Sequence, residues 1–158
     1  MGHLDLDAAI HDRPPWNAGQ NVGPKRPRRR RDIWAIRFCL DEHKRIRDRA
    51  LFDLAIDSKL RAWDLVKLRI GNLVIGGPIR NRATVIQQKT CRPIQFEIMA
   101  ETRSTLERWL ERRGGKLSDF VFPSMIDYVS HLNTRQYARL NGLATVTLTG
   151  VIQCLQLR

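Results

Sequence analysis

The stretch that most constrains the fold runs from residue 47 to residue 72, RDRALFDLAIDSKLRAWDLVKLRIGN. Its apolar residues recur at helical spacing, stop at Asp57 and Ser58, and then resume. The pattern predicts two helices joined by a tight turn, with Asp57 or Ser58 capping the second. Arg61 then lies at a helix start, beside free backbone N–H groups and the positive end of a helix dipole, where a phosphate binds well. The alternative is an ordinary helical hairpin with a solvated arginine.

The periodicity changes after Asn72. Residues 82–88 and 93–98 are predicted to be two strands, because apolar and polar residues alternate in the second of them. The segment KTCR, from Lys89 to Arg92, would form the tip of a β-hairpin. A lysine at such a tip is usually a solubilising surface charge.

Three further helices are predicted. They cover residues 32–43 with Asp32 as the N-cap, residues 99–112 ended by two glycines, and residues 134–140 with Thr134 as the cap. A short extended piece precedes the last of them. In the first, Ile33, Ile36 and Leu40 form an apolar stripe. Trp34 and Phe38 are expected in the core, with base stacking as the alternative. The predicted fold class is α+β, mostly helical with a small antiparallel β-hairpin.

Charge limits the classes of partner. The 158 residues contain 28 Lys and Arg against 16 Asp and Glu, a net charge of +12. Such an excess favours a polyanionic partner, most commonly nucleic acid, over a membrane, for which no suitable amphipathic helix or apolar span is present. The three cysteines have no metal-site or disulfide spacing, and no signal peptide opens the chain. We expect a cytoplasmic protein without a metal or other cofactor.

Composition divides the chain into three parts. Residues 1–31 are expected to be a disordered leader that ends in a basic arm, KRPRRRR, and residues 32–140 to be the folded domain. The arm is expected to lie along DNA phosphates, with binding that weakens steeply as salt rises; a solvated tail is the alternative. Residues 141–158 change abruptly to small, β-branched and apolar residues and form an aberrant tail. A frameshift or truncation in the coding sequence would explain that tail.

The chain contains an arginine motif that is followed by a lysine motif. The first is Ala50-Leu51, Leu54, Leu60-Arg61, Asp64-Leu65 and Leu68, and it resembles the first catalytic-arginine box of the tyrosine recombinases, or phage-type integrases. The second is Lys89 in QQKTCRPI, which resembles the catalytic lysine that this family carries on a β-hairpin after the box. The resemblance spans about residues 33–140, roughly the first half of a recombinase catalytic domain.

The resemblance implies a mechanism. In this family a tyrosine attacks a DNA phosphodiester and forms a 3′-phosphotyrosyl link, without a metal or nucleotide cofactor. Arg61 would stabilise charge on the phosphate oxygens, and Lys89 would protonate the leaving 5′-oxygen. The partner would be double-stranded DNA, on which intact relatives assemble as oligomers. The DNA-binding residues predicted here are Lys25, Arg26, Arg28, Arg29, Arg30, Arg31 and Arg92.

The family pattern is incomplete. No His-x-x-Arg box follows, because His131 and Arg135 have the wrong spacing, and both Tyr128 and Tyr137 come too early to be the nucleophile. Tyr137 is expected to face the core. We therefore expect no strand cleavage by this polypeptide. A non-catalytic DNA-binding protein or regulator is the alternative function, and a basic RNA-binding protein is a third, although the strands offer only Phe96 for base stacking.

Overall fold

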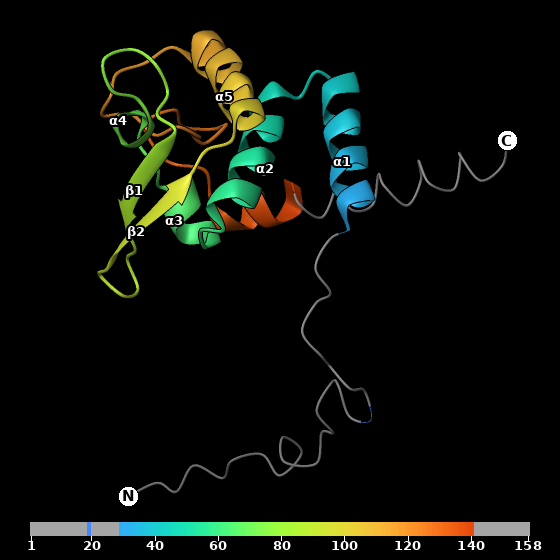
Figure 1. The fold of residues 1–158 in the computed structure, drawn as a ribbon, viewed down its shortest axis with the longest axis horizontal. Coiled ribbons are helices and arrows are strands. Elements are labelled where there is room, and N and C mark those ends of the chain that lie inside the picture. Colours follow the sequence, from blue (N-terminus) through green and yellow to red (C-terminus); the bar gives the residue numbers. More distant parts are fainter. Residues whose placement is uncertain (1–18, 20–28, 141–158) are drawn as a thin grey trace, which may run out of the picture.

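The structure is a computed structural model that describes residue 19 and residues 29–140. The expected leader, the first part of the basic arm and the expected aberrant tail lie outside the described residues. Within them the predicted α+β class is confirmed: helices dominate, and one two-stranded antiparallel sheet accompanies them (Figure 1). The elements are α1 (Arg30–Glu42), α2 (Ile46–Ser58), α3 (Ala62–Val66), α4 (Ile70–Leu73), β1 (Arg82–Ile86), β2 (Pro93–Glu97), α5 (Ala100–Arg113) and a final helical segment over residues 134–140.

Helix α2 is the centre of the molecule. It lies between α1 and the hairpin in Figure 1, and α5 packs along it. The main apolar core joins α2 to α3, the hairpin, α5 and the strand-like residues near 121, and its fully buried members include Leu54, Leu65, Leu106 and Phe122. A separate, smaller cluster of Ile36, Leu40 and Phe52 attaches α1 to the other side of α2.

The core-facing stripe of α1 was predicted correctly, but the role of its aromatics was not. Ile36 and Leu40 are buried, whereas the side chains of Trp34 and Phe38 are 60% and 65% exposed. Residues two positions apart on a helix point in nearly opposite directions, so burial of one pair leaves the other in solvent. The helix also begins earlier than predicted: Arg29 is its N-cap, and the Asp32 carboxylate accepts the Arg29 N–H at 3.2 Å from the first turn.

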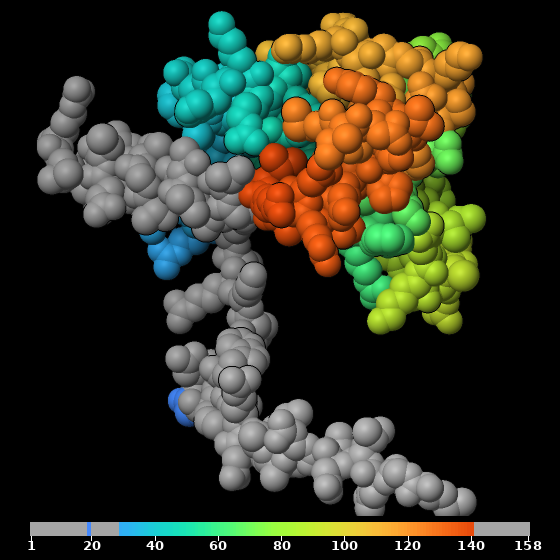
Figure 2. All heavy atoms as spheres, turned by 180° about the vertical axis from the view of Figure 1, so that it is seen from behind, coloured from blue at the N-terminus to red at the C-terminus, as the bar shows by residue number. Residues whose placement is uncertain are grey.

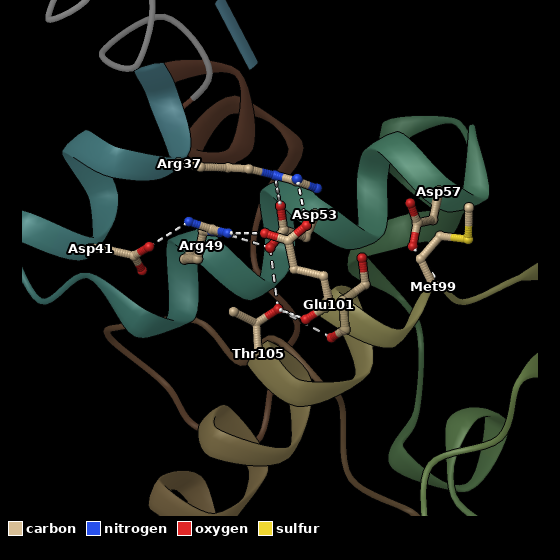
Figure 3. Close-up of polar contacts among 9 residues, drawn as sticks. Arg37, Asp41, Arg49, Asp53, Asp57, Met99, Glu101 and Thr105 are labelled. Atoms are coloured by element: carbon tan, nitrogen blue, oxygen red, sulfur yellow. Dashed lines mark hydrogen bonds and ion pairs between the residues drawn. The ribbon is translucent and has the colours of Figure 1, made fainter. Parts of the chain in front are cut away.

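A buried polar network fixes the three long helices against one another (Figure 3). Asp53 of α2, with no exposed surface, accepts hydrogen bonds from Arg37 of α1 at 2.8 Å, Arg49 of α2 at 2.7 Å and the Thr105 hydroxyl of α5 at 3.1 Å. Glu101 of α5 binds both arginines, at 2.8 and 3.0 Å. Buried charges are tolerated when each has such partners. This network therefore sets the angles between α1, α2 and α5.

The second helix of the predicted helical hairpin is divided in the structure. Only residues 62–66 form α3; the chain then extends and turns again into α4. The extended part pairs with a distant segment, since the Val121 N–H donates to the Leu68 carbonyl and the Ile70 N–H to the Asp119 carbonyl. Those bonds flank an antiparallel bridge between Arg69 and Phe120, which requires an extended backbone at Arg69. The single long second helix predicted from the sequence is therefore wrong.

The remaining elements follow the predictions closely. The two strands are slightly shorter than expected, pair in the register Thr84 to Gln95, and turn Ala83 and Phe96 into the core. Gly114, with φ +66°, ends α5 as expected. The cap of the last helical segment is Asn133 rather than Thr134, because the Asn133 side chain accepts the Arg135 N–H at 3.0 Å.

Candidate functional site

Arg61 stands at the first turn of α3 with its side chain exposed. Helix α2 ends at Ser58, Lys59 adopts a left-handed backbone conformation with φ +52°, and Arg61 is the N-cap of the next helix. Leu60 and Leu65 on either side are buried and fix the backbone there. Because α3 has only five residues, its dipole is smaller than that of the long helix expected from the sequence. The guanidinium itself is therefore the main source of attraction for an anion.

Lys89 lies in the turn of the β-hairpin, as predicted. Two backbone hydrogen bonds close this turn: Gln87 N–H to the Arg92 carbonyl at 3.0 Å, and Cys91 N–H to the Gln87 carbonyl at 2.8 Å. Lys89 and Arg92 are both exposed. Within residues 29–140, neither side chain has a carboxylate partner, and the same is true of Arg61. Three cations are thus available to an external anion.

Contacts centred on Gln88 join the hairpin turn to α3. The buried Asp64 carboxylate accepts the Gln88 backbone N–H at 3.1 Å. The Gln88 side-chain oxygen accepts hydrogen bonds from the Trp63 indole N–H and, at 3.1 Å, from the Lys67 ammonium. Gln88 directly precedes Lys89, and Asp64 is one turn after Arg61. The structure therefore brings together the two elements that carry the predicted arginine and lysine.

An aromatic group beside α3 was not anticipated from the sequence. The His131 ring makes edge contacts with Trp63, at 6.0 Å between ring centroids, and with Phe120, at 5.4 Å. The Lys67 ammonium lies 4.2 Å from the Trp63 ring centroid. Trp63 and His131 are far apart in the sequence, so no local pattern could have indicated this contact. It ties the segment near residue 131 to the α3 side of the site.

Two carboxyl groups have perturbed pKa values, and neither belongs to the group around Gln88. The Lys116 backbone N–H, helped by the nearby Arg113 charge, lowers the pKa of Asp119. The Ser130 hydroxyl and the Val129 N–H lower the pKa of Asp127. Both stabilise turns rather than prepare an acid or a base.

The described residues contain no group of three or more His, Cys, Asp or Glu side chains suited to a metal ion, and Cys39 and Cys91 form no disulfide. None of their helices is both long and apolar enough to cross a lipid bilayer.

Comparison with solved structures identifies the architecture. XerA recombinase superposes with a TM-score of 0.65 at 13% sequence identity, over 82% of this chain and 45% of that one. The chain has the fold of part of a tyrosine recombinase catalytic domain. XerH site-specific recombinase, solved bound to its difH substrate, matches with a TM-score of 0.53 at 18% identity, over 80% of this chain and 40% of that one.

A third tyrosine recombinase structure extends the comparison. A lambda integrase dimer bound to a COC′ core site matches with a TM-score of 0.50 at 19% identity, over 81% of this chain and 38% of that one. This chain therefore spans less than half the length of each of the three recombinases. No family model and no curated protein matched the sequence.

Proposed function

We propose that this chain binds the backbone of double-stranded DNA, as the first part of a tyrosine recombinase catalytic domain. The proposal rests on the hydrogen bonds of Gln88 with Asp64 and Lys67, which bring the Lys89 turn against the helix that begins after Arg61. The shared fold adds support, because two of the similar recombinases were solved on DNA.

The chemistry of the exposed cations suits phosphate. Arg61, Lys89 and Arg92 project from folded elements without carboxylate partners among residues 29–140. A guanidinium matches two phosphate oxygens at once, and an ammonium acts as a compact point charge. The basic arm, Lys25 to Arg31, adds five arginines and a lysine, the last two arginines being the first residues of α1, and the whole chain carries a net charge of +12. Together these groups favour a polyanion that is long enough to contact both the cations of the folded elements and the basic arm.

If a tyrosine were supplied by the remainder of such a domain, Arg61 would stabilise charge on the nonbridging phosphate oxygens, and Lys89 would protonate the 5′-oxygen that leaves as the tyrosine oxygen bonds to phosphorus. A nucleophile is not evident among these 158 residues. Tyr137 is half-buried against the core, and Tyr128 lies in the exposed loop after Pro123. We therefore expect DNA binding without strand cleavage. A covalent protein–DNA adduct formed on a suicide substrate would overturn that expectation.

A titration of fluorescent duplex DNA tests the phosphate contacts. Replacing Lys89 with Ala should weaken binding uniformly across DNA sequences and reduce the magnitude of the salt slope by about one. Arg61→Ala should behave in the same way. The matched control is Arg139→Ala, an exposed arginine of the last helical segment that is not part of the proposed site. Equal affinities and salt slopes in all three variants would overturn the proposal.

The alternative function is a non-catalytic DNA-binding protein whose affinity comes from the basic arm. The density of charge in KRPRRRR favours it. Replacing Arg28, Arg29 and Arg30 with Ala separates the two functions. If the arm variant loses nearly all affinity while Arg61→Ala and Lys89→Ala lose none, the alternative holds.

A further inference from the structure

Two adjoining pockets lie at the end of α2 that is distant from Arg61. The first, of about 320 Å3, is formed by the residues leading into α2, the end of α5 and the loop after Pro123; the second, of about 370 Å3, extends it toward the end of α1. Lys44, Ile46 and Arg112 line both pockets. Figure 2 shows this side of the molecule, where the cyan start of α2 meets gold α5 and the orange loop. We call the two pockets together the α2–α5 groove.

The groove carries uncompensated positive charge. Its two carboxylates are already paired, since Asp48 binds Arg45 at 2.8 Å and Arg47 at 3.0 Å, and Asp41 binds Arg49 at 2.6 Å. Lys44, Arg108 and Arg112 also line it, and these three have no carboxylate partner in residues 29–140. A ligand for this groove must therefore bring negative charge.

The same groove has an apolar side. Trp109 is half-buried at its wall, while Met125 and Tyr128 are 68% and 74% exposed at its rim. Pockets of these volumes accommodate individual side chains rather than a DNA duplex. A thirteen-residue helix is about 20 Å long, so the groove is also separated from the proposed phosphate site at the other end of α2. The chemistry fits an extended peptide that alternates acidic and apolar residues.

We propose that the α2–α5 groove binds residues 4–12 of this same chain, LDLDAAIHD. This segment contains Asp5, Asp7 and Asp12 and no lysine or arginine, and Leu4, Leu6 and Ile10 alternate with its polar positions. In an extended peptide, alternate side chains point to opposite sides, so Leu4 and Leu6 can contact Trp109 and Tyr128 while the Asp5 and Asp7 carboxylates face the free cations.

The intervening chain is long enough. Residues 13–29 connect the segment to the start of α1, and seventeen residues can span about 55 Å when extended. The path back along α1 to the groove is about 20 Å, the length of that thirteen-residue helix. Closing such a loop has only a modest entropic cost. The inference is independent of the proposed DNA-binding function.

Photo-crosslinking of the full-length chain tests the proposal. A benzophenone amino acid replaces Leu6, and crosslinks made in dilute solution are mapped by mass spectrometry. We expect attachment to Met125, Tyr128 or Trp109 within the monomer, and a yield that falls as salt rises. Lys44→Glu with Arg112→Glu should lower the yield about tenfold. The charge-matched control, Arg135→Glu with Arg139→Glu, should leave it unchanged.

A charge reversal keeps the test valid if the groove variant is unstable. Asp5→Lys with Asp7→Lys alone should lower the yield by a similar factor, and combining it with the groove variant should restore part of the crosslinking. Crosslinks scattered over the surface, or equal yields in groove and control variants, would overturn the proposal. Crosslinks found only between two chains would also overturn it and would assign the groove to a second copy.

Discussion

At the scale of single residues, Asp53 is the described position at which we expect a substitution to lower the free energy of unfolding most. Its carboxylate has no exposed surface and neutralises Arg37 and Arg49, whose side chains are 11% and 6% exposed. Removing this carboxylate leaves both guanidinium groups with only the partly exposed carboxylates of Glu101 and Asp41 as charged partners among the described residues. Asp53→Asn is therefore expected to lower the free energy of unfolding by about 3–5 kcal/mol.

Urea unfolding measures this effect, and Asp41 supplies the control. Asp41 also binds Arg49, but its side chain is 51% exposed. Asp41→Asn should lower the free energy of unfolding by less than about 1 kcal/mol, because exposed ion pairs are weak. Similar losses in the two variants would show that the network is not effectively buried.

Asp127 offers a prediction about pH at the same scale. Hydrogen bonds from the Ser130 hydroxyl at 2.6 Å and the Val129 N–H at 3.0 Å favour its ionised form and hold its pKa below the ordinary value of 3.8. Its stabilisation of the loop is thus complete above pH 3.8 and is lost as the pH falls through the lower folded-state pKa. NMR titration should show that lowered pKa, and Ser130→Ala should raise it toward 3.8; an unchanged pKa in that variant would contradict the assignment.

At the scale of elements, the packing of the hairpin turn against α3 depends on one buried carboxylate. Asp64 accepts the Gln88 N–H, and hydrogen bonds to charged groups contribute about 1.5–3 kcal/mol. Asp64→Ala should therefore increase hydrogen exchange at the Gln88 amide by about tenfold or more. Trp63→Phe, which removes a donor to the Gln88 side chain but keeps an aromatic ring beside His131, should change that amide much less. Equal exchange in both variants would mean that the hairpin is held by its own turn.

For the molecule as a whole, two apolar clusters imply unequal stability. Within residues 29–140, α1 is attached by the small cluster around Ile36, Leu40 and Phe52 and by the polar network, whereas α2 and α5 share the main core. Elements with fewer buried contacts open more easily. Amide exchange is expected to show α1 opening at a lower free energy than α2 and α5.

A substitution in the small cluster tests this hierarchy. Ile36→Ala, at a side chain only 1% exposed, should lower the free energy of α1 opening by about 2–5 kcal/mol and leave exchange in α5 largely unchanged. Phe38→Ala, on the exposed side of the same helix, should have little effect on either. Loss of protection in α1 and α5 together would show that the chain unfolds as one unit.

The sequence by itself determined the local elements and the charge. The alternation in residues 93–98, the apolar spacing in residues 47–57 and the glycines after α5 predicted a strand, a helix and a helix end correctly. These features depend on neighbouring residues, which a sequence shows directly. The order of the arginine and lysine motifs indicated the recombinase fold before any distance was known, but the roles of Arg61 and Lys89 in DNA binding are still predictions.

Only the tertiary structure decided which faces are covered and which elements meet. Periodicity placed Ile36 and Leu40 on one apolar stripe, but the exposure of Trp34 and Phe38 depends on where α2 lies. Pairing of Leu68 with Val121 divided the predicted second helix. The hydrogen bonds from Gln88 to Asp64 and from Thr105 to Asp53 likewise join residues that are distant in sequence. Their energies arise from burial and pairing across the fold, which no local pattern of residues records.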